Sequence, residues 1–457
     1  LQSLREEVAP PHSCGRFATT WPRLFARSAV LTSEIVGFVV RAEQGEHPSR
    51  RLETSLRSMS SANSARCCAC AVLVEPAAET ADARAFGLSA RERLERTFAS
   101  LGLRTLSPEA ARDLGGERAV ALCGDHFYDE RLIVALAESP DDLLLVVEEP
   151  DGARMAVGLV GRSSTVERYL SQLGSRPGAG EGAEDPSVRW VTPTDLVPAY
   201  DAKLRKNAPP FVLPVDAERA LEAEGRIFDA SYKGATDFVT KWLWPLPAKI
   251  VTRWCARRGV SPNWVTMWSY VLAVVTLVAF AGGAFTPGLV TAWLMTFLDT
   301  VDGKLARVTL TSTKLGDRLD HGLDLIHPPL WWAAWGAGLA GPAEVFGMYW
   351  PWVTAVFVGY IVGRLLEGLF ILAFDQEMFT WRPFDFAFRL VIARRNPNLV
   401  LLTGSVLIGR PDVGFKAIVV WTLACIGVQC VRIGQAALRQ LQGETIRPFA
   451  EELDAGE

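Results

Sequence analysis

Apolar and charged residues divide the chain into two unlike halves. From Gly259 to Leu298 there is no Asp, Glu, Lys or Arg. In contrast, no stretch between residues 1 and 258 stays uncharged for long enough to cross a bilayer. The pattern therefore predicts a soluble first half and a second half that spans a membrane.

In the first half, short apolar runs alternate with helical patterns, which is typical of an α/β fold. Strands are predicted at 69–74, 118–122, 143–148 and 154–160. One helix is predicted to begin at the capping box of Ser89 and Glu92, and another to follow Asp129. These elements predict an α/β domain over residues 67–215. Residues 1–66 are rich in Arg and Ser, and we interpret them as a disordered leader or an artefact.

Residues 216–258 are basic and aromatic and are expected to link the two halves. Within this segment, Leu246, Ile250 and Trp254 repeat every four residues. An adjacent basic stripe is formed by Lys249, Arg253 and Arg257. This pattern predicts an amphipathic juxtamembrane helix that lies in the headgroup layer, with a packed linker helix as the alternative.

Apolar stretches after Ser261 predict six transmembrane helices. They are expected at about 263–285, 287–307, 317–339, 348–374, 386–408 and 413–438. With six spans both ends lie on one side, where the basic residues between the helices also fall, and the positive-inside rule makes that side cytoplasmic. Near the opposite turn a group of tryptophans resembles an aromatic belt: Trp331, Trp332, Trp335, Trp350 and Trp352.

Charge and cysteine content narrow the class of protein. A formal net charge of -4 over 457 residues excludes a broadly basic nucleic-acid binder. The eight cysteines are clustered or single and do not resemble a disulfide framework. We therefore expect an integral protein of the cell (inner) membrane, with its soluble domain and its active site facing a reducing cytoplasm.

Four aspartates stand where the second predicted span ends and the third begins: Asp299, Asp302, Asp320 and Asp324. Helical spacings of three and four residues place each pair on one face of its helix. Four acids at one point near a membrane boundary repel one another unless cations neutralise them. Mg²⁺ or Mn²⁺ with all-oxygen ligands suits such a cluster, so we predict a metal site there.

The residues between those acids predict what the metal site binds. Gly303, Ala306 and Gly316 are small and leave room for a bulky group against the backbone, and Arg307 supplies a cation one turn after Asp302. Carboxylate-bound metal, small residues and a basic group together are typical of a diphosphate site.

A second set of polar groups lies in or beside the later apolar helices: Arg364, Arg394, Arg395 and Arg432. Ionisable groups at such depth face a cavity in most membrane proteins. We expect this set to bind an acceptor, either phosphorylated or a lipid headgroup. A purely structural pair between Arg364 and Glu367 is the alternative.

The run of residues from Asp299 to Asp324 matches every position of the signature of the CDP-alcohol phosphotransferases (CDP-alcohol phosphatidyltransferases), and the resemblance covers roughly residues 261–438. It implies that an acceptor hydroxyl attacks the distal phosphate of a CDP-linked alcohol and that CMP leaves. By this resemblance, two Mg²⁺ or Mn²⁺ ions are held by Asp299, Asp302, Asp320 and Asp324, and Asp324 is also the catalytic base. Gly303, Ala306, Arg307 and Gly316, with Asp302, would bind the nucleotide.

The first half has a resemblance of its own. Residues 89–103 followed by Cys123-Gly124-Asp125-His126 are similar to the sugar-phosphate nucleotidyltransferase fold. That fold normally has a glycine-rich phosphate loop after its first strand, whereas this chain has Glu75-Pro76-Ala77-Ala78-Glu79. We therefore expect a degenerate domain. The order of the halves resembles the bifunctional inositol-1-phosphate cytidylyltransferase/di-myo-inositol phosphate phosphate synthase arrangement.

Together these patterns predict an α-helical polytopic membrane domain of six transmembrane helices over residues 259–440, with an acidic tail at 441–457. A soluble α/β, Rossmann-like nucleotidyltransferase-type domain precedes it. The expected partners are a CDP-alcohol donor such as CDP-diacylglycerol, an alcohol or phospho-alcohol acceptor, membrane lipids and a second copy of the chain as a homodimer. The alternative function is a divalent-cation transporter that uses the aspartate cluster.

Overall fold

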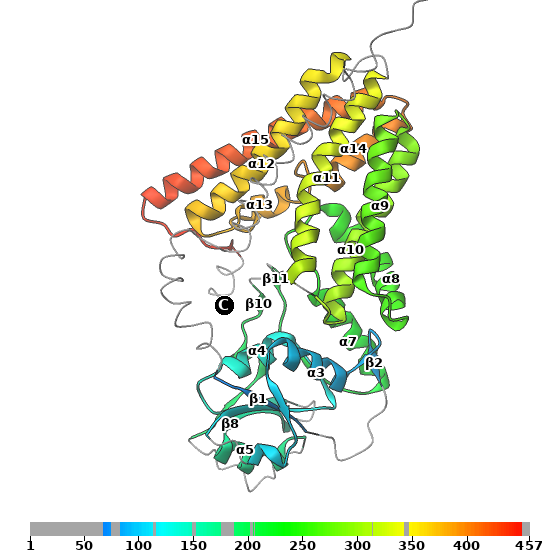
Figure 1. Ribbon diagram of the computed structural model, residues 1–457. Helices are drawn as coiled ribbons and strands as arrows, with labels where there is room; N and C mark the ends of the chain where they lie inside the picture. Colours follow the sequence, from blue (N-terminus) through cyan, green and yellow to red (C-terminus); the bar gives the residue numbers. More distant parts are fainter. Residues whose placement is uncertain are drawn as a thin grey trace, which may run out of the picture.

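The computed structural model describes residues 67–74, 83–112, 116–148, 152–174, 187–201, 204, 206–312, 314–341 and 347–449, apart from the side chains of 217–218, 314–315, 317–321 and 323. An α/β half lies below a half made of long helices (Figure 1). The predicted leader, the Glu75–Glu79 segment and the end of the acidic tail lie outside the described residues.

The α/β half is built on a mixed sheet. In spatial order its strands are β4 (Arg104–Leu106), β1 (Cys70–Val74), β5 (Arg118–Cys123), β8 (Arg154–Arg162), β7 (Leu143–Glu148) and β9 (Arg189–Val191). Strand β1 is parallel to β4 and β5, but β8 is antiparallel to β5 and β7. The four predicted strands are confirmed. The sheet differs from a parallel Rossmann sheet because β7 and β8 form a consecutive antiparallel pair.

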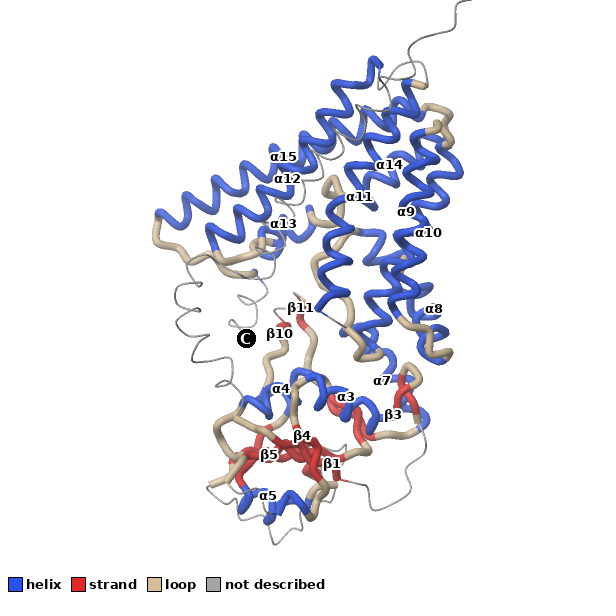
Figure 2. The backbone as a smooth tube through the Cα atoms, viewed as in Figure 1, coloured by secondary structure: helices blue, strands red, loops and turns tan. Residues whose placement is uncertain are grey.

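Helices cover both faces of this sheet. The helices α3 (Ala90–Ser100) and α4 (Glu130–Glu138) lie on the face turned toward the long helices, and α5 (Ser163–Tyr169) lies on the other, as Figure 2 shows. The predicted capping box begins α3, because Ser89 Oγ accepts from Glu92 N at 3.1 Å and Glu92 Oε2 accepts from Ser89 N at 2.9 Å. The predicted cap Asp129 begins α4.

Short elements complete the α/β half and lead out of it. They are β2 (Arg84–Ala85), β3 (Leu88–Ser89), η1 (Ala110–Arg112), β6 (His126–Tyr128), η2 (Leu170–Gln172), α6 (Pro193–Leu196), β10 (Tyr200–Asp201), β11 (Lys206–Asn207) and β12 (Val212–Pro214). Strand β12 pairs with β6 and is followed directly by α7 (Ala217–Ala230).

The second half is helical. After α7 come η3 (Val239–Leu243), α8 (Pro245–Arg257), α9 (Pro262–Ala281), α10 (Phe285–Val308), α11 (Lys314–Ala340), η4 (Gly347–Tyr349), α12 (Trp350–Phe374), η5 (Met378–Thr380), α13 (Pro383–Phe388), α14 (Arg395–Leu407) and α15 (Pro411–Leu441). Within the described ranges, three stretches are long and apolar enough to cross a membrane: Pro262–Ala281, Gly347–Phe374 and Pro411–Leu441. Helices α10 and α11 are also long, but they carry the predicted acid cluster.

The fifth predicted helix, 386–408, is not continuous. Helix α13 ends at Phe388 and α14 begins at Arg395. Between them, Leu390 O accepts from Phe238 N at 3.1 Å, and at the start of α14 Asn396 Nδ2 donates to Asp237 Oδ1 at 3.0 Å. The break exists because this segment forms polar contacts with the chain just before η3.

The prediction of an aromatic belt is wrong for three of its five tryptophans. Trp331, Trp332 and Trp335 are fully buried among the helices. The indole nitrogens of Trp331 and Trp335 donate to the carbonyl oxygens of Ala273 and Pro411, at 3.0 and 3.2 Å. Large aromatic side chains bury well when their N–H finds such a partner, and these three fill the centre of the bundle.

Helix α8 has the predicted amphipathic pattern. The side chains of Leu246, Ile250 and Trp254 are 73%, 61% and 52% exposed, whereas Ala248 and Cys255 on the other side are buried. An apolar stripe this exposed suits a helix lying at a membrane surface.

Candidate functional site

A polar cavity of about 340 Å³ lies where α10, α11, α12 and the start of α14 meet the segment between α7 and η3. Charged side chains from all four helices line it. The site is therefore assembled from parts of the chain that are far apart in sequence, and the break between α13 and α14 supplies one of its walls.

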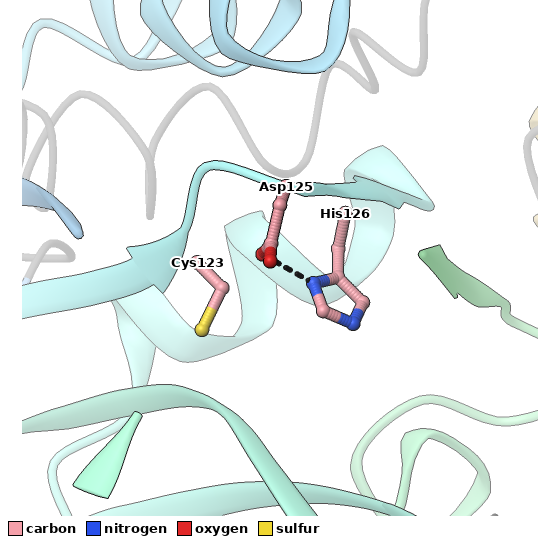
Figure 3. A group of neighbouring side chains, drawn as sticks. All are labelled: Cys123, Asp125 and His126. Carbon is pink, nitrogen blue, oxygen red and sulfur yellow. Dashed lines mark hydrogen bonds and ion pairs between the residues drawn. The ribbon is translucent and has the colours of Figure 1, made fainter. Parts of the chain in front are cut away.

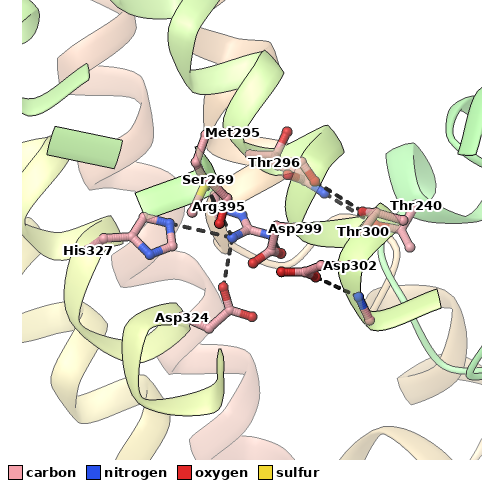
Figure 4. Close-up of polar contacts among 12 residues, drawn as sticks. Thr240, Ser269, Met295, Thr296, Asp299, Thr300, Asp302, Asp324, His327 and Arg395 are labelled. Atoms are coloured by element: carbon pink, nitrogen blue, oxygen red, sulfur yellow. Dashed lines mark hydrogen bonds and ion pairs between the residues drawn. The ribbon is translucent and has the colours of Figure 1, made fainter. Parts of the chain in front are cut away.

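Two of the predicted acids, Asp299 and Asp324, line this cavity, and Asp302 lies beside Asp299 (Figure 4). Asp299 and Asp302 come from α10 and Asp324 from α11. Arg395 lies between two of them: its Nη2 donates to Asp299 Oδ2 and its Nη1 to Asp324 Oδ1, both at 2.7 Å. A guanidinium that bridges two carboxylates indicates that this point attracts positive charge.

Asp302 is the most enclosed of the three acids, with 4% of its surface exposed. Its Oδ1 accepts from Gly303 N at 2.5 Å, while its Oδ2 is buried without a hydrogen-bond partner among the described residues. Asp299 and Asp324 are close enough to act on it electrostatically. A buried carboxylate oxygen without a partner is costly, which favours a cation as the missing partner.

The fourth acid, Asp320, lies one turn before Asp324 on α11, and its side chain is outside the described set. Beside the acids, His327 Nε2 lies 3.4 Å from Arg395 Nη1, and the His327 ring packs edge-on against Trp331. The histidine therefore supports the arginine and the core.

The predicted nucleotide residues divide into two groups. Gly303 and Arg307 line the cavity, and a Cβ on Gly303 would lie 3.1 Å from Arg307 Nη2. Ala306 is half-buried beside them, and neither it nor Gly316 is among the described residues that line the cavity. The absence of a side chain at 303 thus leaves room for Arg307 along the cavity wall.

The predicted acceptor residues also divide. Glu367 is buried in α12 and accepts from Arg364 Nη1 at 2.8 Å and from Arg394. Arg395 belongs with the acids, as described above. Arg432 lies apart from the cavity, where its Nε and Nη2 donate to Asp385 at 2.6 and 2.7 Å.

Other cavity residues were not assigned to the site from the sequence. Arg389 faces the same space, and none of the described residues forms a hydrogen bond with its buried Nη1. Asp237 and Thr240 bind Asn396 Nδ2 at 3.0 and 3.2 Å. Tyr232, before η3, lies under Lys304, whose Nζ is 3.4 Å from the ring centre. Among these residues, only Arg389 had a recognisable sequence signal, because it is an arginine inside a predicted transmembrane helix.

A separate group in the α/β half brings Cys123, Asp125 and His126 together, with one ligand atom of each within 4.8 Å of the others (Figure 3). Asp125 Oδ1 and His126 Nδ1 are 2.7 Å apart. Burial raises the pKa of the Cys123 thiol to about 12. Burial also raises the pKa of Asp125, but contact with His126 outweighs it and leaves that pKa below its ordinary value. A protonated thiol is a poor metal ligand. The main partner of Asp125 in this group is therefore the His126 ring and not a metal ion shared with Cys123.

Residues 259–393 match the sequence model of the CDP-alcohol phosphatidyltransferase family. No curated protein matches the chain. The match contains α9 to α12 and the described acids, and it supports a membrane transferase that acts in lipid synthesis. It gives no support to a cation transporter.

Proposed function

We propose that this protein transfers a substituted phosphate from a CDP-alcohol to an acceptor hydroxyl and releases CMP. The observation that carries the proposal is that Asp299 and Asp324 line one polar cavity together with Gly303 and Arg307, with Asp302 beside Asp299. Acids that hold cations, next to a small residue and a basic one, suit a diphosphate.

The donor set fits Mg²⁺ or Mn²⁺, because carboxylate oxygens are the preferred ligands of these hard cations. Asp299, Asp302 and Asp324, together with Asp320, would hold two ions. The buried Oδ2 of Asp302 and the bridging position of Arg395 both support this assignment. When bound, such ions neutralise charge on the diphosphate and stabilise the CMP leaving group.

The remaining steps of the transfer depend on the protein's own side chains. Arg307 binds diphosphate oxygens, and Gly303 leaves the wall of α10 open for the nucleotide. Asp324, at the mouth of the cluster, takes the proton of the incoming hydroxyl. The hydroxyl oxygen then forms its bond to the distal phosphate as the bond to CMP breaks, without a covalent enzyme intermediate.

The far end of the cavity supports a phosphorylated acceptor. Arg364, Arg389 and Arg394 converge here around Glu367, and Asp237 and Glu377 line the same cavity. Three converging guanidinium groups offer many N–H donors in a fixed geometry, which suits the oxygens of a phosphate. The alternative of a purely structural Arg364–Glu367 pair does not account for the other two arginines.

The proposal also includes the arrangement of the protein in the membrane. We expect six membrane crossings, with α13 and α14 as a broken fifth one, and by the positive-inside rule the cavity and the α/β half face the cytoplasmic side of the cell membrane. The exposed stripe of α8 lies in the headgroup layer. A homodimer follows from the family resemblance.

The first test supplies purified full-length protein with CDP-diacylglycerol or soluble CDP-alcohols, with Mg²⁺ or Mn²⁺ and with phosphorylated or plain alcohols. We expect CMP release and a new phosphodiester, measured by mass spectrometry. If no donor yields CMP while Mn²⁺ accumulates in proteoliposomes, the transporter alternative replaces the transferase.

A second test concerns the acceptor end. Arg389→Gln is expected to raise the KM for a phosphorylated acceptor by about 10- to 100-fold, because a charge-assisted hydrogen bond is lost. The KM for the CDP-alcohol should stay unchanged. The control is Arg410→Gln, which removes an exposed arginine bound to Asp412 outside the cavity. An unchanged acceptor KM in Arg389→Gln would remove this arginine from the acceptor site.

A further inference from the structure

The carboxyl end of α10 is held by the α/β half. Arg93 Nη1, from α3, donates to Val308 O at 2.6 Å, and Arg96 Nη1, one turn later, donates to Thr309 O at 2.6 Å. Val308 is the last residue of α10, and Thr309 caps it. The last carbonyl groups of a helix have no partner within the helix and carry partial negative charge, so two guanidinium groups there satisfy and stabilise them.

Arg93 is built into this contact. It is buried, and its second contact outside α3 is with Glu130 at the start of α4, 3.9 Å from Nη2. Burial lowers the pKa of Arg93 to about 10, so the side chain still carries its charge at neutral pH. A buried arginine is costly unless its donors are used, and here one of them is committed to α10.

The same end of α10 also shares an apolar core with the α/β half. Val301, Leu305 and Val308 form one buried face of α10. They belong to one cluster with Phe86 and Phe127 of the α/β half. Their spacing places all three residues on one face of the helix, and this face packs against the α/β half.

The opposite face of α10 serves the cavity. Asp299, Gly303 and Arg307 repeat every four residues and line it. Between the two faces, Lys304 is buried, and its Nζ donates to Ser231 O at 2.8 Å, just after α7. The α/β half and α7 thus fix the rotation and the end of the helix that presents the acids.

We propose that Arg93 and Arg96 are positioning residues for the transferase: they hold the carboxyl end of α10 so that Asp299, Gly303 and Arg307 keep their places around the donor. The inference rests on the proposed function. It gives the α/β half a role in transfer whether or not that half binds a nucleotide itself.

The test uses the full-length protein in lipid nanodiscs with CDP-diacylglycerol as donor. The double variant Arg93→Gln/Arg96→Gln is expected to raise the donor KM by roughly tenfold to a hundredfold, since displacements of about 1 Å at a site have effects of that size. The KM for the acceptor should change less than about twofold. A loss of folded protein would instead lower the apparent kcat and leave both KM values unchanged.

A second readout does not depend on activity. Amide hydrogen exchange at Thr309, Leu310 and Thr311, whose N–H groups close the end of α10, is expected to become roughly tenfold faster in the double variant. Arg93→Lys/Arg96→Lys should restore part of both effects. The control is Arg91→Gln on the same helix, which removes an exposed arginine that contacts Glu95.

The outcomes separate the two proposals. If the wild-type protein releases no CMP, the proposed function fails, while the exchange measurement still decides whether the two arginines hold α10. Wild-type exchange and an unchanged donor KM in the double variant would overturn the inference. If the double variant does not fold, the single variant Arg96→Gln, at an exposed position, is measured with the same expectations.

Discussion

Replacing Asp302 by asparagine is expected to lower CMP release by at least about a thousandfold while leaving the protein folded, because a metal ligand contributes several kcal/mol to the transition state. Asp302 is the most enclosed of the three described acids, and its Oδ2 is buried without a hydrogen-bond partner in the part of the chain that the structure describes. The change removes both a ligand and a negative charge. The measurement is CMP release across a range of Mg²⁺ and Mn²⁺ concentrations, alongside the melting temperature.

Two further results are expected if the aspartates bind metal ions. Asp320→Asn should cause a similar loss, and a chelator should abolish turnover by the wild-type protein. The matched control is Asp412→Asn, an acid that pairs with Arg410 at the start of α15 and does not line the cavity. Full turnover in the presence of the chelator would refute the metal site.

The variant Asp324→Asn tests whether Asp324 is the catalytic base or only a metal ligand. Affinity for the CDP-alcohol should largely remain, while turnover falls by about two to four orders of magnitude, the usual contribution of a general base. Exposure supports the distinction: the side chain of Asp324 is 45% exposed and that of Asp299 only 10%. Calorimetry of donor binding beside CMP release measures both quantities.

The comparison variant for this prediction is Asp299→Asn, in which metal and donor binding should weaken together. If Asp324→Asn lost as much donor affinity as Asp299→Asn, Asp324 would be only a metal ligand. The proton would then need another acceptor, such as phosphate or water.

Local signals were sufficient for much of the fold. The capping box at Ser89 placed the start of α3, and uniform apolar runs placed β1, β5, β7 and β8. These signals act over a few residues, so the sequence contains them directly. The weak edge strands β4 and β9, of three residues each, have too little pattern to be recognised.

Contacts between distant segments explain the features that the local sequence pattern did not predict. The tryptophans from 331 to 335 have the composition of an interfacial belt, but Trp331 and Trp335 are buried where their N–H groups reach the carbonyls of Ala273 and Pro411. Likewise, the hydropathy of 386–408 predicts one helix, whereas contacts with Asp237 and Phe238 interrupt it. Such contacts join residues that are 58 to 159 positions apart, a distance at which no periodicity operates.

For the site, the sequence spacing predicted that the acids would lie close together, and Asp299, Asp302 and Asp324 are neighbours in Figure 4 because α10 and α11 are regular helices. It did not anticipate that Arg395 would bridge the acids or that Arg432 would bind Asp385 instead. A long arginine can reach several partners, and its choice among them depends on the packing of neighbouring helices.

The apolar core that joins Phe86 and Phe127 to α10 also has a consequence for biosynthesis. The α/β half leaves the ribosome first, but the side chains that cover these rings belong to helices made up to about 90 residues later, roughly 5 to 20 s at ordinary rates of elongation. During that interval its apolar surface is open to water and to chaperones. Completion of the α/β half therefore waits for α9 and α10, and the two halves mature as one unit.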